Sequence, residues 1–432
     1  MKPWQPSLLL ALACLAPQPA WALEPLEVFL KAGREANFDN REARISAARQ
    51  VEETWVAWSR LLPVFDARLV YTRNQYEGRI RIPNGDGSFN ERVVSAQDQT
   101  DAFLELSLPL IDLGKWAQIA AAEDGEVAAH ARAEATGLEV QKAIARAYYQ
   151  VVAADALLEA SDRNVKSALE NLRYVEQRQA AGFANEVDVK RAAAEVERNR
   201  QTEADSRYLL ETSRRLLGTL SGTSPGTGVA PLVVELEASA PLSEWLGEGL
   251  EVHPTVKAAR AEADAADART TAATALLLPS IAASAQERFT NAAGFVESPY
   301  YTVSATARWQ LDLGAIPARS SVALEAEAAR VRQERALRAA ADTIFSDWHQ
   351  VEAQRQKGKA ARAELEASQM AARLVKQRYE AGTANWLDVI LAERDLFGAE
   401  VSKVRSDADL AYARVALALS SGRGLGEGGS KP

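Results

Sequence analysis

Apolar and polar residues alternate strictly along one stretch of the chain, residues 301–311. The side chains that share one face of this stretch are apolar or aromatic: Tyr301, Val303, Ala305, Ala307, Trp309 and Leu311. The residues between them are mostly polar, so the period of two predicts a strand of about eleven residues with one apolar and one polar face.

Three further strands are predicted near residues 64–73, 101–110 and 280–289. The strand at 101–110 repeats the alternation of the last one (300–311) with its register shifted by one, and Pro109 stands where Trp309 does, which predicts a β-bulge. Residues 74–100 join the first two strands, and their polar, turn-rich composition predicts an unconstrained surface loop.

The segments that follow the strands have the heptad period of long packed helices. Residues 117–180 carry one regular stripe of large and small side chains: Ile144, Ala147, Val151, Ala154, Leu158, Ser161, Val165, Ala168, Leu172 and Val175. A helix of about 60 residues extends roughly 90 Å, which is longer than a globular core needs. A second long helix is predicted at 318–380, with a less regular stripe.

Each long helix ends at an Ala-Gly pair, residues 181–182 and 381–382. Glycine tolerates the left-handed conformation that closes a helix, and Asn185 and Asn385 are suited to cap the helix that follows. The sequence therefore predicts two antiparallel helical hairpins, at 117–220 and 318–420.

The chain contains one unit twice, at an offset of 200 residues. Nine of the seventeen positions of segment 174–190 are identical in segment 374–390. This duplication predicts the following organisation: signal peptide 1–22, repeat 1 at 23–222, linker or equatorial segment 223–253, repeat 2 at 254–420 and disordered tail 421–432.

The N-terminal residues have the pattern of a secretory signal peptide. Lys2 precedes an apolar run, and Ala20-Trp21-Ala22 fits the small-x-small cleavage pattern, so we expect cleavage after Ala22. The chain's one cysteine, Cys14, lies inside this segment, where lipidation is the alternative.

Composition argues against several functions. The formal net charge of −9 disfavours nucleic acid as a partner. The three histidines, His130, His253 and His349, share no metal-ligand spacing, and no nucleotide or nucleophile motif is present. We expect no enzyme activity, no cofactor and no metal site.

Four amphipathic strands are too few to close a barrel, for which about eight are needed. Sharing strands among copies of the chain would solve this, because two copies supply eight strands and three supply twelve. Strands of about ten residues also suit an outer-membrane barrel. The alternative, a soluble periplasmic coiled-coil scaffold, explains the heptads but not the strands.

Two motifs carry a resemblance to a known family. Residues 108–114 read Leu-Pro-Leu-Ile-Asp-Leu-Gly, and both hairpin tips read Ala-Gly-x-Ala-Asn-x-x-Asp-Val, at 181–189 and 381–389. Together with the signal-peptide pattern and the duplication, these motifs resemble those of the TolC family of outer-membrane efflux proteins. The resemblance implies an α+β membrane protein, with four strands per chain in a homotrimeric twelve-stranded β-barrel and a long periplasmic α-helical barrel.

The resemblance also implies a function and partners. The chain would be the outer-membrane exit duct of a tripartite efflux or type I secretion system, and would work with a periplasmic adaptor (membrane fusion) protein and an inner-membrane transporter. The positions that match the adaptor-contacting tips are Ala181, Gly182, Phe183, Ala381, Gly382 and Thr383. Simple turn formation by the glycines is the alternative role.

Asp388 matches an aspartate that narrows the pore in this family, and Asp188 is its counterpart in the first repeat. Leu391 and Ala384 depart from the pattern, which puts a second acidic ring and an arginine latch in doubt. Both aspartates could instead stabilise helix N-termini through the helix dipole.

Aromatic residues near the strand ends are candidates for a membrane girdle in contact with outer-membrane lipid. The four selected are Tyr71, Tyr300, Tyr301 and Trp309.

Overall fold

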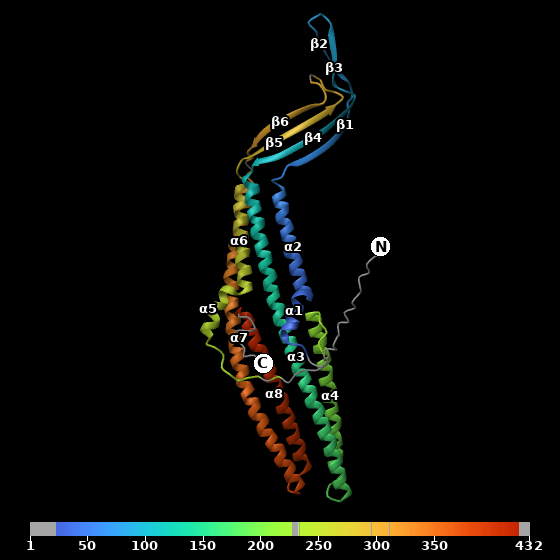
Figure 1. The fold of residues 1–432 in the computed structure, drawn as a ribbon, viewed down its shortest axis with the longest axis vertical. Coiled ribbons are helices and arrows are strands. Elements are labelled where there is room, and N and C mark those ends of the chain that lie inside the picture. The colour runs from blue at the N-terminus through green and yellow to red at the C-terminus, as the bar shows by residue number, and fades with distance from the viewer. Residues whose placement is uncertain (1–22, 227–231, 233, 295, 311, 423–432) are drawn as a thin grey trace, which may run out of the picture. The chain divides into compact units, whose positions relative to one another are not determined.

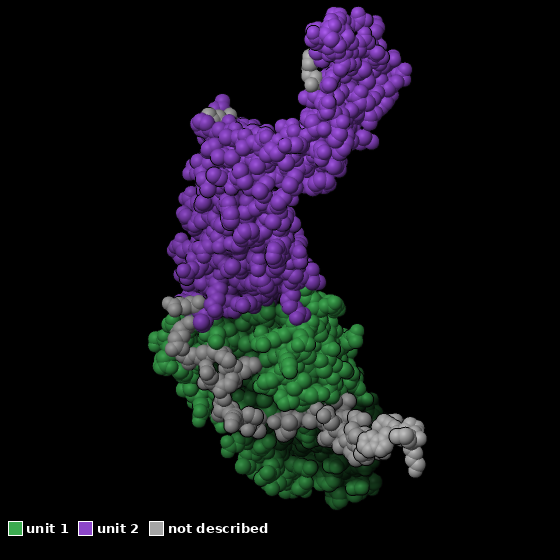
Figure 2. All heavy atoms as spheres, turned by 45° about the horizontal axis from the view of Figure 1, so that its top comes forward, with its two compact units in different colours: residues 1–41, 137–249, 342–432 green, residues 42–136, 250–341 purple. Residues whose placement is uncertain are grey.

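The computed structural model describes residues 23–226, 232, 234–294, 296–310 and 312–422 (Figure 1). The predicted signal peptide, Leu311 and most of the predicted tail lie outside the described residues. The chain forms two compact units: unit 1 comprises residues 1–41, 137–249 and 342–432, and unit 2 comprises residues 42–136 and 250–341 (Figure 2). Each predicted repeat contributes to both units, so the units do not coincide with the repeats.

Unit 2 contains a four-stranded antiparallel sheet with the strand order β1-β4-β5-β6. Its strands are β1 (Val64–Arg73), β4 (Asp98–Ile111), β5 (Ser280–Thr290) and β6 (Tyr300–Arg308). The pairing of β4 with β5 joins the first repeat to the second. This order leaves β1 and β6 as the two edges of the sheet.

The predicted bulge is confirmed, because the pairing of β4 with β5 shifts register between Pro109 and Ile111. Proline has no backbone N–H to give to the ladder, so the pairing is irregular there. β6 ends at Arg308, which leaves Trp309 just outside the strand.

The prediction of an unconstrained loop at 74–100 is wrong. β2 (Gly78–Pro83) and β3 (Phe89–Ser95) form a two-stranded hairpin that extends from the ends of β1 and β4 (Figure 1). Its turn is closed by the Asn84 N–H, which donates to the Ser88 carbonyl at 2.7 Å. Across the strands, Arg81 Nε donates to the Glu91 carboxylate at 2.7 Å. Such cross-strand pairs hold together a segment whose composition indicates only turns.

Helices lead to and from the sheet. α2 (Phe38–Ser59) and α6 (Pro254–Ala275) precede β1 and β5. α3 (Leu113–Ala180) follows β4, and α7 (Ala315–Glu380) follows β6. α3 and α7 run from unit 2 into unit 1.

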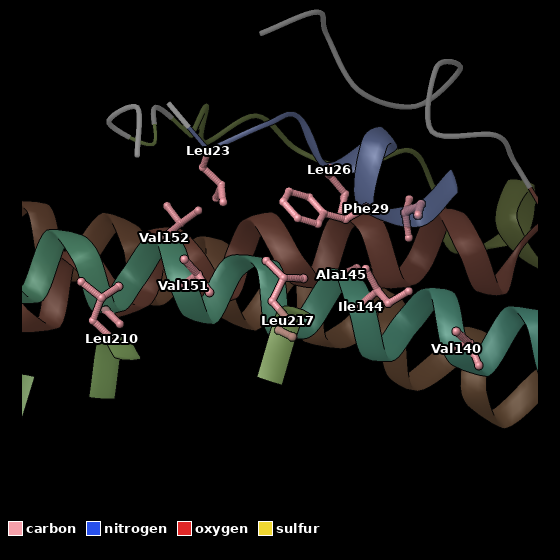
Figure 3. Packing of buried hydrophobic residues seen from close by; sticks show 13 residues of the cluster. Leu23, Leu26, Phe29, Val140, Ile144, Ala145, Val151, Val152, Leu210 and Leu217 are labelled. Carbon is pink, nitrogen blue, oxygen red and sulfur yellow. The ribbon is translucent and has the colours of Figure 1, made fainter. Parts of the chain in front are cut away.

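In unit 1 each long helix turns back as a hairpin, with α4 (Glu186–Ser221) returning from α3 and α8 (Trp386–Ser420) from α7 (Figure 1). α1 (Leu26–Ala36) packs on the first hairpin. Phe29, Ile144 and Leu217 are fully buried where α1, α3 and α4 meet (Figure 3). The small residues of the predicted stripe, among them Ala147 and Ala154, are also buried there, which lets the helices approach closely.

The predicted linker is partly helical, with α5 at Leu242–Val252. Before α5 its backbone is held against α7. Arg362 donates to the Val234 carbonyl at 2.6 Å, and Trp348 Nε1 donates to the Ala240 carbonyl at 2.8 Å. Arg362 also pairs with Asp407 of α8 at 3.1 Å, so the linker, α7 and α8 form one hydrogen-bonded layer.

Gly222, which ends α4, offers a test of this packing. Its φ is +72°, and an added Cβ would clash with Ala36 Cβ of α1. We expect Gly222→Ala to lower the free energy of unfolding by about 1–3 kcal/mol, since alanine is strained at positive φ. Thermal unfolding of the purified protein, followed by circular dichroism, measures this change.

Gly398→Ala is the matched control, because Gly398 lies inside α8 with open space around its Cα. It should leave stability unchanged or raise it by up to about 1 kcal/mol. Equal melting temperatures for Gly222→Ala and the unmodified protein would show that the α4–α1 contact is not tight.

Candidate functional site: two hairpin tips and a two-faced sheet

The two hairpin tips have the same backbone geometry. Gly182 and Gly382 adopt φ values of +78° and +76°. The residue after each glycine donates its N–H at 2.8 Å to the carbonyl of an arginine five residues earlier, Arg178 or Arg378. The six predicted tip residues are all exposed, and Phe183 has 75 % of its surface accessible. The glycines therefore make the turns, and the side chains around them remain free to meet a partner.

The two predicted pore aspartates lie at the starts of the returning helices. Asn185 Oδ1 accepts from the Asp188 N–H at 2.9 Å, and Asn385 Oδ1 accepts from the Asp388 N–H at 3.0 Å. Asp388 Oδ2 also accepts from the Asn385 N–H at 3.2 Å, which completes a capping box. Both asparagines thus cap the returning helices, only Asp388 adds a side-chain contact to its cap, and the exposed Asp388 still presents a carboxylate to solvent.

A groove of about 490 Å³ on the second hairpin brings Asp388 beside Ala384, Leu391 and Asp395. Asp395 lies seven residues after Asp388 on α8, which is two helical turns and therefore the same face. Asp395 is absent from the residues selected from the sequence, which place a second acid one turn after Asp388. The spacing of seven residues between Asp388 and Asp395 is the feature of the sequence that places both on one face of the helix.

Arg178 joins the first hairpin to the second close to the tips. Its guanidinium lies 4.9 Å from the centroid of the Tyr379 ring, and its Nη1 donates to the Tyr379 carbonyl at 3.3 Å. Tyr379 is buried, and burial raises the pKa of its phenol although the Arg178 cation lowers it. The sequence reasoning did not select Arg178, although the repeated Gln-Arg at 177–178 and 377–378 lies inside the duplicated motif.

A second link joins the hairpins through α4 and α8. Arg394 of α8 donates to both carboxylate oxygens of Glu195 of α4, at 3.1 and 2.6 Å. Glu393 lines the adjacent cavity of about 290 Å³, and burial raises the pKa of its carboxyl group. Arg178 and the Arg394–Glu195 pair thus hold the hairpins together at different distances from the tips.

The sheet has one apolar face and one charged face. Leu69, Tyr301 and Val303 lie on the apolar face with 72 %, 80 % and 70 % of their surface exposed. The opposite face carries three arginines and three carboxylates within the strands: Arg68, Arg288, Arg308, Asp66, Asp101 and Glu105. A strongly exposed apolar face in a folded chain marks a surface that contacts lipid or protein.

The predicted girdle is corrected at Tyr300. Tyr300 pairs with Arg288 across the strands, and its hydroxyl accepts from Arg288 Nη1 at 3.1 Å, which places it on the charged face. Adjacent residues of a strand point to opposite faces, so Tyr300 and Tyr301 cannot both lie on the apolar side. Tyr71 lies on the apolar face near the far end of β1 and donates to Asp98 at 2.6 Å.

Tryptophans gather where the helices meet the sheet. Trp309 Nε1 donates to the Leu277 carbonyl at 3.1 Å, and Trp58 and Trp116 pack edge to face with ring centroids 5.7 Å apart. Trp58 and Trp116 are not among the residues selected from the sequence, because they lie in helices whose pattern does not show that the sheet is near.

Within the described helices, no segment has the length and apolarity needed to cross a bilayer. In the same part of the chain, no three metal-binding side chains come together. His253 caps α6, where its Nδ1 accepts from the Thr255 N–H at 3.3 Å.

The chain is similar to several known proteins. The chain is 23 % identical over 431 residues to the pyoverdine export outer membrane protein OpmQ of Pseudomonas putida, which covers 94 % of this chain and 87 % of OpmQ. It is 28 % identical over 156 residues to protein CyaE of Bordetella pertussis, a match that spans only 34 % of this chain and 33 % of CyaE. The CmeC outer membrane channel of Campylobacter jejuni has the same fold, with a TM-score of 0.76, 18 % identity and coverage of 92 % of this chain and 85 % of CmeC.

The family model for outer membrane efflux proteins matches residues 31–223 and 245–423, which include both hairpin tips and all four strands of the sheet. The chain belongs to the outer membrane efflux protein family.

Proposed function

We propose that three copies of the chain close one twelve-stranded barrel in the outer membrane and form the exit duct of a tripartite efflux system. The sheet carries this proposal. Its apolar face is exposed, its other face is charged, and its edge strands β1 and β6 have no partner on their outer sides within the described chain. Three sheets joined edge to edge would pair those edges, turn the apolar faces to lipid and enclose the charges in a lumen.

The helical hairpins form the periplasmic end of the duct in this proposal. The exposed tip residues, with Phe183 the most prominent apolar side chain among them, contact a periplasmic adaptor protein. An inner-membrane transporter supplies the energy, and the duct itself is passive. The match to OpmQ over most of its length supports a role in export. The proposal includes export of the chain by a signal peptide that is cleaved after Ala22.

The mass of the native particle tests the assembly. The outer-membrane fraction is extracted with mild detergent, and the protein mass is determined after the detergent contribution is removed. We expect three times the mass of the mature chain. A water-soluble monomer or dimer would contradict the barrel and favour a periplasmic scaffold.

The duct opens, in this proposal, when the hairpins of each chain move apart. Arg178 and the Arg394–Glu195 pair cross from one hairpin to the other, so both contacts must break or rearrange during opening. Both are partly solvated, so each contributes only about 0.5–1 kcal/mol.

Arg178→Met should therefore raise the open probability of the reconstituted channel by about two- to fivefold, which corresponds to this loss of restraint. Single-channel recording in planar bilayers measures it. Arg200→Met is the control, because Arg200 pairs with Glu197 within α4 alone. Equal open probability in Arg178→Met and Arg200→Met would exclude Arg178 as a restraint.

Asp388 provides a second prediction, for the periplasmic aperture. Three Asp388 carboxylates around a narrow mouth would favour cations. Asp388→Asn keeps an oxygen that can accept from the Asn385 N–H but removes the charge, so it should lower cation over anion permeability and weaken block by multivalent cations. Reversal potentials in a salt gradient measure the change, and Asp188→Asn, which should have the smaller effect, is the control. Unchanged selectivity in Asp388→Asn would rule out an acidic ring at this position.

A further inference from the structure

The charged face of the sheet holds an aromatic ring between two arginines. Phe103 lies on β4, and its cross-strand neighbours are Arg68 on β1 and Arg288 on β5. The guanidinium carbons of Arg68 and Arg288 lie 4.9 and 5.4 Å from the centroid of the Phe103 ring. Two cation–π contacts to one ring fix both guanidinium groups over the surface of the sheet.

The two arginines differ in their remaining partners. Arg288 is held by Asp101, to which its Nε and Nη2 donate at 3.0 and 2.8 Å, and by the Tyr300 hydroxyl at 3.1 Å. Among the described residues Arg68 forms no ion pair, and its side chain is exposed. The charge of Arg288 is therefore largely compensated by Asp101, whereas that of Arg68 remains available to a ligand.

Acidic residues lie next to the Arg68–Phe103–Arg288 group on the charged face. Asp66 and Glu105 face each other across β1 and β4 on the same face, two residues nearer to the α2 end of β1. The charged face thus has a band nearer the helices with Asp66, Glu105 and Arg308, and an arginine–phenylalanine band that includes Asp101 farther out. In the barrel of the proposed function, on which this inference rests, both bands line the lumen.

We propose that Arg68, Phe103 and Arg288 form a contact site in the lumen for aromatic solutes that carry anionic groups. A guanidinium held near a ring can stack with a second aromatic ring and offers its N–H groups to carboxylate, sulfonate or phosphate oxygens. Arg68 supplies the free charge, Phe103 fixes its orientation, and Arg288 with Asp101 forms the rigid side of the site. Three copies would place three such sites around the lumen, and each solute would bind briefly on its way out.

The test uses the full-length trimer in planar bilayers and two trivalent anions at neutral pH, naphthalene-1,3,6-trisulfonate and citrate. The two probes carry similar charge, but only the first is aromatic. We expect the trisulfonate to block the ion current at a concentration about tenfold lower than citrate does, since stacking on arginine adds to the charge interaction.

The variants separate this site from general electrostatics. Arg68→Gln should raise the half-blocking concentration of the trisulfonate about tenfold. Phe103→Leu should raise it about threefold, because Arg68 keeps its charge but loses its support. The matched control is Arg308→Gln. Arg308 lies on the same face, opposite Ser280, without an aromatic ring against it, so its loss should change the half-blocking concentration less than twofold.

Equal block by the two anions in the unmodified channel would overturn the inference and leave the duct intact. Equal changes of the half-blocking concentration in Arg68→Gln and Arg308→Gln would also overturn the inference, because positive charge alone would then explain the block. Absence of any channel current from a correctly sized trimer would overturn the duct, and the inference with it.

Discussion

The architecture depends on a four-stranded sheet with one apolar and one charged face. Within the described chain, nothing pairs its outer edges or covers its apolar face. The outer edges of β1 and β6 carry backbone groups that need partners, and side chains such as Tyr301 and Val303 need an apolar environment. The charged side chains of Arg68, Asp66 and Glu105 need contact with water instead. The closed barrel of the proposed function would meet all three needs at once.

The helical hairpins combine two kinds of contact between long helices. Small residues in the α3 stripe, such as Ala147 and Ala154, allow close packing near α1, where Phe29 and Ile144 are fully buried. Toward the tips the contacts between the hairpins include solvated polar links, Arg178 with Tyr379 and Arg394 with Glu195. These solvated links lie beside an apolar cluster near the tips, in which Val175, Tyr379 and Trp386 are buried, so polar and apolar contacts together join the hairpins there.

At the tips, residues that stabilise the helix turns also lie at the surface. Asp388 completes a capping box with Asn385 and also stands exposed in a groove with Asp395. Gly182 and Gly382 close their helices at positive φ and so bring Phe183 and Thr383 to the surface. The duplicated tip motif therefore reflects the demands of a helix turn, and the residues around the turn are available for recognition.

Much of this architecture follows from local spacing, and the sequence by itself determined it. Period two was clearest in the strands near 101–110 and 300–311, the heptad stripe identified α3, and the Ala-Gly and Asn positions located both hairpin turns. The repeated tip motif, residues 108–114, the duplication and the signal-peptide pattern together indicated the family. These features depend on residues a few positions apart, so the sequence displays them directly.

Only the tertiary structure decided which residues from distant segments meet. It placed Arg178 against Tyr379, Arg394 against Glu195 and two arginines against Phe103. It also moved Tyr300 to the charged face and made a hairpin of residues that read as a loop. Each of these contacts depends on strand register or helix rotation. Register and rotation are set by packing between segments up to about 200 residues apart, so the local periodicity of the sequence does not predict them.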